Sequence, residues 1–404
     1  MPQEANIAPA AGGILPFERN GTSRTGGWTA VLALTLCVST LIASEFMPVS
    51  LLTPIASDLH LSEGEAGQAI AVSGIFAVLT SLIIAAASRN VDRRTLLLGL
   101  TALMIASGLV VAFSPSFAML IAGRALLGIV IGGFWSMSTA TVMRLVPERE
   151  VPRALALLNG GNALATTVAA PLGSYLGQYI GWRGAFFCLV PLAAATLAWL
   201  FASLPSMPDR SRSSLAAPFR VVGRPSVAWG IAAVTLFFMG QFTLFTYLRP
   251  FLETVTRVEV STLSLILLVV GASGLLGTYL IGRVLKTRLY FVLIATPLAM
   301  AAVALGLVAF GASALAATAL LAFWGLLGTA APVAWWTWLS RALPDDAEAG
   351  GGLMVAVIQL AITLGAAGGG LLFDGGGHRA TFIASAVILG ASALVAALAS
   401  RGTR

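Results

Sequence analysis

Long apolar runs, broken only by rare charges, dominate this sequence. Between Gly26 and Ser57, Glu45 is the only Asp, Glu, Lys, Arg or His. A helix that spans a bilayer needs about 20 consecutive, mostly apolar residues. A carboxylate inside such a helix costs roughly 2.5–3.5 kcal/mol on insertion-based scales. The run therefore predicts a transmembrane helix in which Glu45 has a role that outweighs this cost.

The composition excludes an ordinary soluble protein. Hydrophobic residues make up 58% of the 404 residues and charged residues only 10%, whereas a soluble domain carries about 25% charged residues. The chain is expected to be an integral, multi-pass membrane protein. Cys37 and Cys188 lie inside apolar runs and are interpreted as small packing residues. Residues 1–27 lack the apolar core of a signal peptide and are predicted to remain as a tail.

Twelve apolar segments can be drawn along the chain. Ser62 and Glu65 have the spacing of a capping box just before the second segment. The fold class is thus predicted to be an all-α membrane protein with 12 transmembrane helices. The predicted segments are 28–56, 65–87, 95–113, 117–143, 154–176, 183–203, 227–252, 262–282, 289–308, 312–339, 351–373 and 380–399.

The positive charges predict the orientation. The tail, the even-numbered loops and the C-terminus hold 18 Lys and Arg residues, and the odd-numbered loops hold 3. Positively charged loops stay in the cytoplasm, so both termini are predicted to be cytoplasmic. Two arginines, Arg124 and Arg249, fall inside predicted spans. A basic surface for nucleic acid is not indicated, because the charges lie in short gaps between spans.

The longest gap, 204–226, is rich in Ser, Pro and Arg and divides the chain into two sets of six spans. The halves resemble each other: "RLVPE" at 144–148 matches "RALPD" at 341–345, and "EFMP" at 45–48 matches "YLRP" at 247–250. The predicted domains are a cytoplasmic tail (1–27), a six-helix bundle (28–203), a cytoplasmic linker (204–226) and a second six-helix bundle with a short tail (227–404). Two pseudo-symmetric bundles around a central path are typical of transporters that rock between two states.

Glu45 and Arg124 are the candidate proton-coupling residues. Acidic groups inside a membrane usually mark ion or proton paths. Arg124, in the fourth span, could reach Glu45 if their helices are neighbours. The alternatives are that Glu45 is satisfied by a neighbouring hydroxyl or amide, and that Arg124 extends outward or bonds backbone carbonyls.

Aromatic and amide side chains deep in the spans are candidates for substrate binding. Trp135, Trp324, Trp335 and Tyr247 offer flat faces, although tryptophans also pack in cores or sit at the membrane interface. The amides could read the donors and acceptors of a neutral polar solute, or they could link helices to one another. The candidate amides are Asn159, Asn162, Gln241 and Gln359.

Several function classes are not indicated. A nucleotide-binding Walker A loop needs a Gly-Lys pair, and the only lysine, Lys286, follows a leucine. His60 and His378 are isolated, so no metal site is expected. The sequence offers no catalytic residues and no cofactor site, and it indicates a non-enzyme.

Motifs such as "EFMPVSLLTP" (45–54), "DRRTLLL" (92–98) and "GGFWSMS" (132–138) resemble those of the major facilitator superfamily, in its drug/proton antiporter branch, and within it a group of bacterial purine ribonucleoside exporters. The resemblance covers nearly the whole chain from Trp28. Two departures concern the loop after the second span and the fifth-span antiporter motif, which begins with Ala170 in place of Gly-Pro. The other motifs include "LSEGEAGQ" (61–68), "APLGSYLG" (170–177), "FTYLRP" (245–250) and "AVIQLA" (356–361).

The resemblance implies proton-coupled efflux of purine ribonucleosides such as inosine and guanosine across the bacterial cytoplasmic membrane. It implies that Arg124 matches the arginine of the family's fourth-span motif. The expected partners are the nucleoside, protons and the lipid bilayer, with the chain acting as a monomer. Export of sugars or small drugs remains an alternative, and so does a membrane sensor with the shape of a transporter, which would not need an ionisable Glu45.

Overall fold

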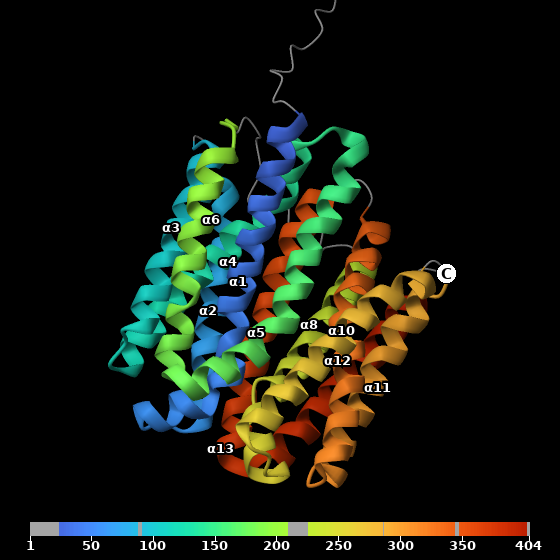
Figure 1. The fold of residues 1–404 in the computed structure, drawn as a ribbon. Helices are drawn as coiled ribbons and strands as arrows, with labels where there is room; N and C mark the ends of the chain where they lie inside the picture. The colour runs from blue at the N-terminus through green and yellow to red at the C-terminus, as the bar shows by residue number, and fades with distance from the viewer. Residues whose placement is uncertain (1–23, 88–90, 209–224, 286, 344–346, 402–404) are drawn as a thin grey trace, which may run out of the picture.

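The computed structural model describes residues 24–87, 91–208, 225–285, 287–343 and 347–401, and the regular elements in these ranges are helices (Figure 1). The tail to residue 23 and most of the predicted linker lie outside the described residues. The helices are α1 (Arg24–Leu59), α2 (Glu63–Ala87), α3 (Arg93–Ala112), α4 (Phe117–Leu145), η1 (Glu148–Glu150), α5 (Val151–Phe187), α6 (Leu189–Ser203), α8 (Pro225–Phe245), α9 (Leu248–Phe251), η2 (Leu252–Thr256), α10 (Val260–Leu285), α11 (Leu289–Phe310), α12 (Ala314–Ala342) and α13 (Ala347–Arg401).

Within the described residues, ten helical runs are long and apolar enough to cross a membrane. Two of them, Glu148–Ser203 with 56 residues and Gly350–Ser400 with 51, are long enough for two crossings each. Dividing both would give the predicted twelve crossings, and that exact number stays a prediction. The chain is accordingly an all-α, multi-pass membrane protein.

Two glycines break these long runs. Gly181 (φ 71°, ψ 167°) and Gly377 (φ 62°, ψ −164°) adopt backbone angles that are essentially open to glycine alone. The chain folds back after Gly377. As a result, the Thr381 hydroxyl lies 3.5 Å from the carbonyl oxygen of Gly369, which precedes the bend. Gly181 lies between the predicted fifth and sixth spans, and Gly377 between the eleventh and twelfth.

The predicted seventh span, 227–252, is wrong at its C-terminal end. Helix α8 stops at Phe245, and a short α9 and the π-helix η2 follow. Pro250 has no N–H to bond the carbonyl of Thr246, which a continuous helix would require. The N–H of Tyr247 bonds Leu244 instead, at 3.1 Å, in a tighter turn. The chain is thereby bent where Tyr247 and Arg249 meet the N-terminal helices.

Short polar side chains begin several helices. The predicted capping box is confirmed: the N–H of Glu65 donates to Ser62 Oγ (3.0 Å), and the N–H of Ser62 donates to Glu65 Oε2 (2.8 Å). Asp92 caps α3 by accepting from the N–H of Arg94 at 2.7 Å. Although burial opposes it, hydrogen bonds from Ser206, Met207 and Arg94 lower the pKa of Asp92. Asp92 thus fixes the start of α3 and holds the end of the first six-helix segment beside it.

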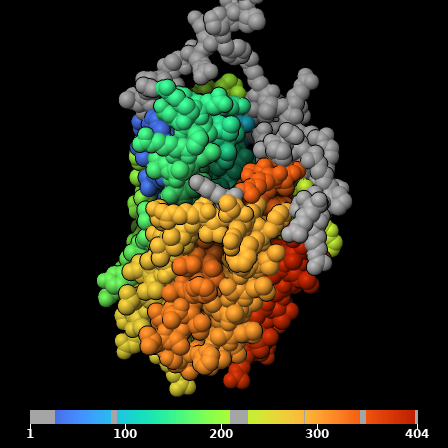
Figure 2. Space-filling view, turned by 90° about the vertical axis from the view of Figure 1, so that its right-hand side faces the viewer, coloured from blue at the N-terminus to red at the C-terminus, as the bar shows by residue number. Residues whose placement is uncertain are grey.

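The described helices pack into two large hydrophobic cores and one smaller core. One large core is built mainly from α1, α3, α4, α5 and α6, and the other mainly from α8 and α10 to α13. The smaller core joins the end of α1 and parts of α2 and α5 to Tyr247. In Figure 2 the surface of the C-terminal helices, yellow to red, lies below the teal and green surface of the N-terminal helices.

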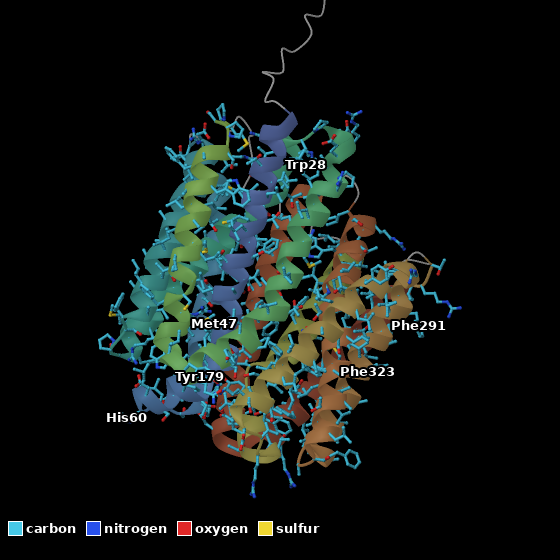
Figure 3. All side chains as sticks on the ribbon, viewed as in Figure 1. Trp28, Met47, His60, Tyr179, Phe291 and Phe323 are labelled. Atoms are coloured by element: carbon cyan, nitrogen blue, oxygen red, sulfur yellow. The ribbon has the colours of Figure 1, made fainter. Side chains whose placement is uncertain are left out.

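The outer surface of the bundle is apolar, as a lipid-facing surface requires. Phe291 is 61% exposed and Phe323 47%, and Phe291 lies at the edge of the bundle in Figure 3. The same view places Trp28 and His60, near the two ends of α1, at opposite ends of the molecule. With 36 residues, α1 is about 54 Å long, which exceeds the hydrocarbon thickness of a bilayer.

Close helix packing depends on glycine at Gly277. A Cβ added there would lie 1.9 Å from the carbonyl oxygen of Leu326 on α12, whereas a Cβ at Gly282, on the same helix, meets no atom within 4 Å. We expect Gly277→Ala to lower the melting temperature of the purified protein, because α10 and α12 must move apart. Gly282→Ala should leave it unchanged or raise it slightly, since alanine favours a helix by about 1 kcal/mol. Equal melting temperatures for the two variants would contradict this packing.

Candidate functional site

Glu45 lies at the seam, the contact surface that α1, α2 and α5 share with α8, α9, α10 and α13. It occupies the middle of α1 and is 7% exposed. Its Oε1 accepts a hydrogen bond of 3.1 Å from Nε2 of Gln359, on α13. This bond joins residues 314 positions apart. An acidic group of the N-terminal helices is therefore paired directly with an amide of the C-terminal helices.

Other groups close the seam around this pair. Phe46 of α1 stacks on Phe242 of α8, with ring centroids 5.8 Å apart and planes at 27°. The hydroxyl of Thr363, one turn after Gln359, lies 3.3 Å from the carbonyl oxygen of Ala71 on α2. Gly74 lets α2 and α13 approach this closely, because a Cβ there would lie 2.0 Å from Thr363 Oγ1. The Glu45–Gln359 contact is thus packed between neighbouring helices.

Arg124 is buried, with 1% of its surface exposed, and lies beside Glu45. Within the described residues its guanidinium forms no ion pair with the Glu45 carboxylate; it donates instead to the carbonyl oxygens of Ser44 (2.7 Å), Glu45 (3.2 Å) and Ala69 (3.1 Å). A further bond of 3.0 Å goes to the hydroxyl of Ser73. The predicted pairing of the two side chains is therefore replaced by the alternative, bonding to backbone carbonyls.

A proline explains why α1 accepts this arginine. The carbonyl of Ser44 would normally bond the N–H four residues later, but that residue is Pro48, which has no N–H. Arg124 Nη1 supplies the missing donor at 2.7 Å. A buried carbonyl without a donor costs about 1–3 kcal/mol, so Arg124 stabilises the bent segment of α1 that carries Glu45.

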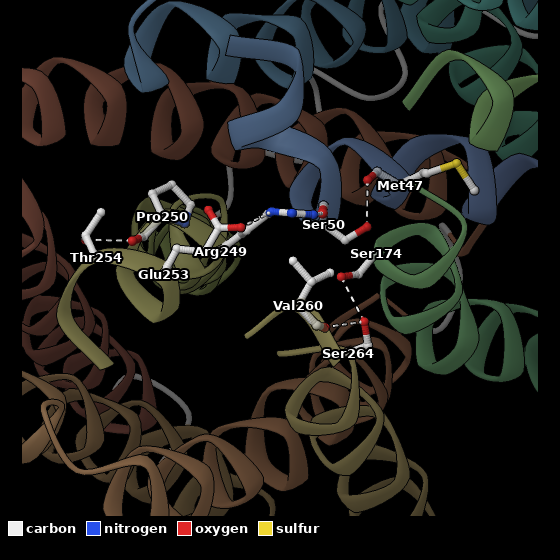
Figure 4. Close-up of polar contacts among 9 residues, drawn as sticks. All are labelled: Met47, Ser50, Ser174, Arg249, Pro250, Glu253, Thr254, Val260 and Ser264. Carbon is white, nitrogen blue, oxygen red and sulfur yellow. Dashed lines mark hydrogen bonds and ion pairs between the residues drawn. The ribbon is translucent and has the colours of Figure 1, made fainter. Parts of the chain in front are cut away.

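A second carbonyl of α1 is freed by a proline and bonded by an arginine, about one and a half turns further along α1. This arginine belongs to the C-terminal helices, across the seam. Pro54 leaves the carbonyl of Ser50 without its helical donor. Arg249 of α9, 5% exposed, donates to that carbonyl through Nη1 and to Glu253 Oε1 through Nε at 2.8 Å (Figure 4). The sequence placed Arg249 inside a span without a role. The sequence did contain a signal for its partner. Pro54 stands four residues after Ser50, so the carbonyl of Ser50 needs a donor from outside α1.

Helix α2 and the bend of α13 meet at one end of the seam, here named the Asp374 end. Asp374 accepts from the hydroxyl of Ser62 (2.7 Å) and from the N–H of Gly64 (3.0 Å). Ser264 and Ser174 bond each other at 2.9 Å between α10 and α5 (Figure 4). Among the described residues, the side-chain hydrogen bonds between N-terminal and C-terminal helices lie from the level of Glu45 to this end. The protein is therefore closed at the Asp374 end.

Of four predicted substrate-binding residues in the C-terminal half, Tyr247, Trp324 and Trp335 are buried and Gln241 is half-buried. Tyr247 stacks on Phe373 with ring centroids 5.2 Å apart, and its hydroxyl donates to the carbonyl of Ala366 at 2.7 Å. Trp324 and Trp335 are 1% and 2% exposed and lie in the C-terminal core. Gln241 packs against α12 at Gly328. The ring faces of Tyr247, Trp324 and Trp335 are therefore covered by protein in this conformation.

The other three predicted residues belong to the N-terminal helices. Trp135 is half-buried against the N-terminal core and meets Phe134 edge to face at 6.1 Å. Asn159 is exposed and donates to Leu155 of its own helix at 2.9 Å. Asn162 is half-buried, three residues further along α5. The structure brings together Glu45, Arg124 and Gln359 and leaves the other seven predicted residues apart from them.

Three buried polar atoms of α8, α12 and α13 have no partner among the described residues: Oε1 of Gln241, Nε1 of Trp324 and Oε1 of Gln359. Buried polar atoms are normally hydrogen-bonded. One donor and two acceptors are therefore free to bond a solute or a proton-bearing group. Glu45 can carry a proton and already contacts Gln359, so this part of the seam can combine protonation with polar recognition.

Comparisons with known proteins agree with this arrangement. The Major Facilitator Superfamily profile matches residues 32–362. The chain is 57% identical to the transcription regulatory protein OpdE of Pseudomonas aeruginosa over 96% of this chain and 97% of that protein. It is 41% identical to the purine ribonucleoside efflux pump NepI of Salmonella enteritidis, over the same shares.

A solved structure shows the same fold. It is a bacterial homolog of the human lysosomal transporter Spinster, in an inward-facing and occupied conformation. The TM-score is 0.74 at 16% identity, with 94% of this chain and 98% of that chain covered. Together with the profile match and the 41% identity to the efflux pump, these findings show that the chain belongs to the major facilitator superfamily.

Proposed function

We propose that this protein exports purine ribonucleosides such as inosine and guanosine, in exchange for protons that enter the cell. The observation that carries the proposal is the buried carboxylate of Glu45, paired across the seam with Gln359. A change in the protonation of Glu45 alters a contact that involves both the N-terminal and the C-terminal helices. The 41% identity to relatives named purine ribonucleoside efflux pumps supports the choice of substrate.

A nucleoside suits the unpartnered polar atoms of α8 and α12. A purine base has flat apolar faces and a rim of donors and acceptors, and an unpaired rim atom would cost about 1–3 kcal/mol when buried. The unpartnered Nε1 of Trp324 and Oε1 of Gln241 offer a donor and an acceptor. Trp324 therefore contributes through its N–H rather than only through its ring face. We propose that the remaining predicted residues contact the solute at other stages of transport: Trp135, Asn159, Asn162, Trp335 and Tyr247.

The test is uptake of radiolabelled inosine into everted membrane vesicles, with and without an acidic interior. Proton-coupled export predicts accumulation that needs the pH gradient and collapses when a protonophore is added. Excess guanosine should displace the label, and free ribose should not. Displacement by ribose as strong as by guanosine would replace the nucleoside with a sugar substrate. Displacement by unrelated lipophilic cations would indicate a drug exporter.

A second candidate function is a membrane-embedded regulator, because the relative with 57% identity is named a transcription regulatory protein. A regulator that senses a solute need not move it or carry a proton on Glu45. Inosine that binds to the purified protein but is not accumulated by vesicles under any gradient would favour this candidate.

We further propose that the Asp374 end faces outward, that both termini are cytoplasmic, and that the protein works as a monomer in the bacterial inner membrane. The excess of Lys and Arg in the loops at the opposite end supports this orientation. With the Asp374 end closed, the described conformation would face inward. The alternation then requires the bonds of Asp374 and Arg249 across the seam to break when the outer end opens.

A labelling experiment tests the orientation. In a Cys188→Ser background, a membrane-impermeant maleimide added to intact cells should label Pro115→Cys, which lies between α3 and α4. It should not label Glu148→Cys, which lies between α4 and α5. Both original residues are exposed, and the other native cysteine, Cys37, is buried. Labelling at position 148 but not at 115 would reverse the orientation.

A further inference from the structure

We propose that Gln359 is a positioning residue for the proton: once Glu45 is protonated, the acid and the Gln359 amide form two hydrogen bonds that fasten the outer end shut. This inference rests on the proposed proton-coupled function and goes beyond it. It assigns to one amide the task of converting protonation into a contact between α1 and α13. The role is distinct from binding the solute, because the amide acts through Glu45.

In the present contact the amide N–H of Gln359 is bonded and its carbonyl oxygen is not. Nε2 of Gln359 donates to Glu45 Oε1 at 3.1 Å, while Oε1 of Gln359 is buried without a partner among the described residues. Gln359 is 5% exposed, so water cannot readily satisfy that oxygen. An ionised carboxylate has no proton with which to fill the vacancy, since it only accepts hydrogen bonds.

Protonation supplies the missing donor. The proton adds to a lone pair of Glu45 Oε2 and forms an O–H bond, while the carboxylate loses its negative charge. That O–H donates to Gln359 Oε1, and Glu45 Oε1 continues to accept from Nε2. A carboxylic acid and a primary amide are complementary in this way, each with one donor and one acceptor side by side. No other covalent bond changes, and the proton comes from the outer solution.

The charged groups around Glu45 leave this pairing free to form. Arg124 of α4 faces it most closely, but all its described bonds go to backbone carbonyls and to Ser73. Arg249 of α9 bonds further along α1, at Ser50. The ionisable residues of α2, α5, α10 and α13 within the described ranges lie near the ends of these helices or at the bends by Gly181 and Gly377. At this level of the seam, Gln359 is the partner of the carboxylate's side-chain oxygens.

The expected consequence is a seam that tightens when a proton binds. Two bonds that replace one, together with the loss of a buried charge, should favour the state closed at the Asp374 end by about tenfold. Thr363 gives a matched comparison. Its hydroxyl lies 3.3 Å from the carbonyl oxygen of Ala71 across the same seam and 2.8 Å from that of Gln359 in its own helix, and it does not titrate.

The experiment measures closure at acidic and alkaline pH in lipid nanodiscs. Spin labels at Pro115→Cys and Ala312→Cys, both in the Cys188→Ser background, report the distance between the two halves at the proposed outer end. In the otherwise unaltered protein the closed population should be about tenfold more favoured at acidic pH. Gln359→Leu should remove this pH dependence. Thr363→Val should weaken closure equally at both pH values and keep the dependence.

Glu45→Gln provides a second, independent variant. A glutamine at position 45 has a donor and an acceptor at every pH, so it can form both bonds with Gln359 permanently. It should be closed at the outer end at both pH values, as the unaltered protein is in acid. This variant keeps the test valid even where Gln359→Leu fails to fold.

The outcomes separate this inference from the proposed function. A Gln359→Leu variant that responds to pH as the unaltered protein does would overturn the role of Gln359, while inosine uptake by vesicles would still support export. Closure that is independent of pH in the unaltered protein, or Glu45→Gln that opens at alkaline pH, would also overturn it. Absence of gradient-driven uptake would instead refute the proposed function.

Discussion

Replacing Glu45 with glutamine is expected to abolish gradient-driven accumulation of inosine in everted vesicles while leaving inosine binding intact. The amide has nearly the same shape as the acid, so the packing around a residue that is 7% exposed should persist. The amide cannot take up and release a proton, so the exchange loses its driving ion. The measurements are uptake under a pH gradient and equilibrium binding of labelled inosine to the purified variant.

Glu65→Gln is the matched control. Glu65 is exposed and belongs to the capping box of α2, in which glutamine serves as well as glutamate. This variant removes the same negative charge from the same half of the protein and should transport normally. If Glu45→Gln vesicles accumulate inosine as well as Glu65→Gln vesicles do, Glu45 is a structural acid and protons do not pass through it.

The sequence predicted most of the fold because membrane insertion constrains composition so strongly. The apolar runs, the capping box of Ser62 and Glu65, and the burial of Glu45 all follow from local patterns. The breaks at Gly181 and Gly377 were placed between spans for the same reason. The end of α8 was mispredicted because hydropathy continues through Tyr247 to Leu252, whereas the loss of the Thr246 hydrogen bond at Pro250 is a geometric effect that hydropathy ignores.

The candidate site was predictable in its members and not in its contacts. Glu45, Arg124 and Gln359 were each identified as polar groups deep in spans, but their pairing depends on which helices are neighbours. Sequence separation hides this, since Glu45 and Gln359 are 314 residues apart. Phe46, Phe242 and Thr363 were missed because nothing in their local sequence marks them as facing the seam.

The two prolines of α1 could have predicted the partners of Arg124 and Arg249. Each proline frees a carbonyl four residues earlier, and both of these carbonyls are bonded by a buried arginine. Arg124→Leu is therefore expected to lower the melting temperature strongly, because Ser44 loses its donor and the links from α4 to α1 and α2 are lost. The buried carbonyl left without a donor costs about 1–3 kcal/mol, and the bonds of Arg124 to Ala69 and Ser73 on α2 are lost with it. Thermal denaturation of the purified variant in detergent measures the change.

The identity of the rescuing substitution tests the mechanism. Pro48→Ala restores an N–H that can reach the carbonyl of Ser44, so it should recover about 1 kcal/mol or more in the Arg124→Leu background. Pro54→Ala should not, because it restores the donor for Ser50, the acceptor of Arg249. In an Arg249→Leu background the pattern should reverse, with Pro54→Ala rescuing and Pro48→Ala failing. Pro48→Ala and Pro54→Ala could instead rescue either arginine variant equally well. That result would mean that a straighter α1, rather than a donor for one carbonyl, restores stability.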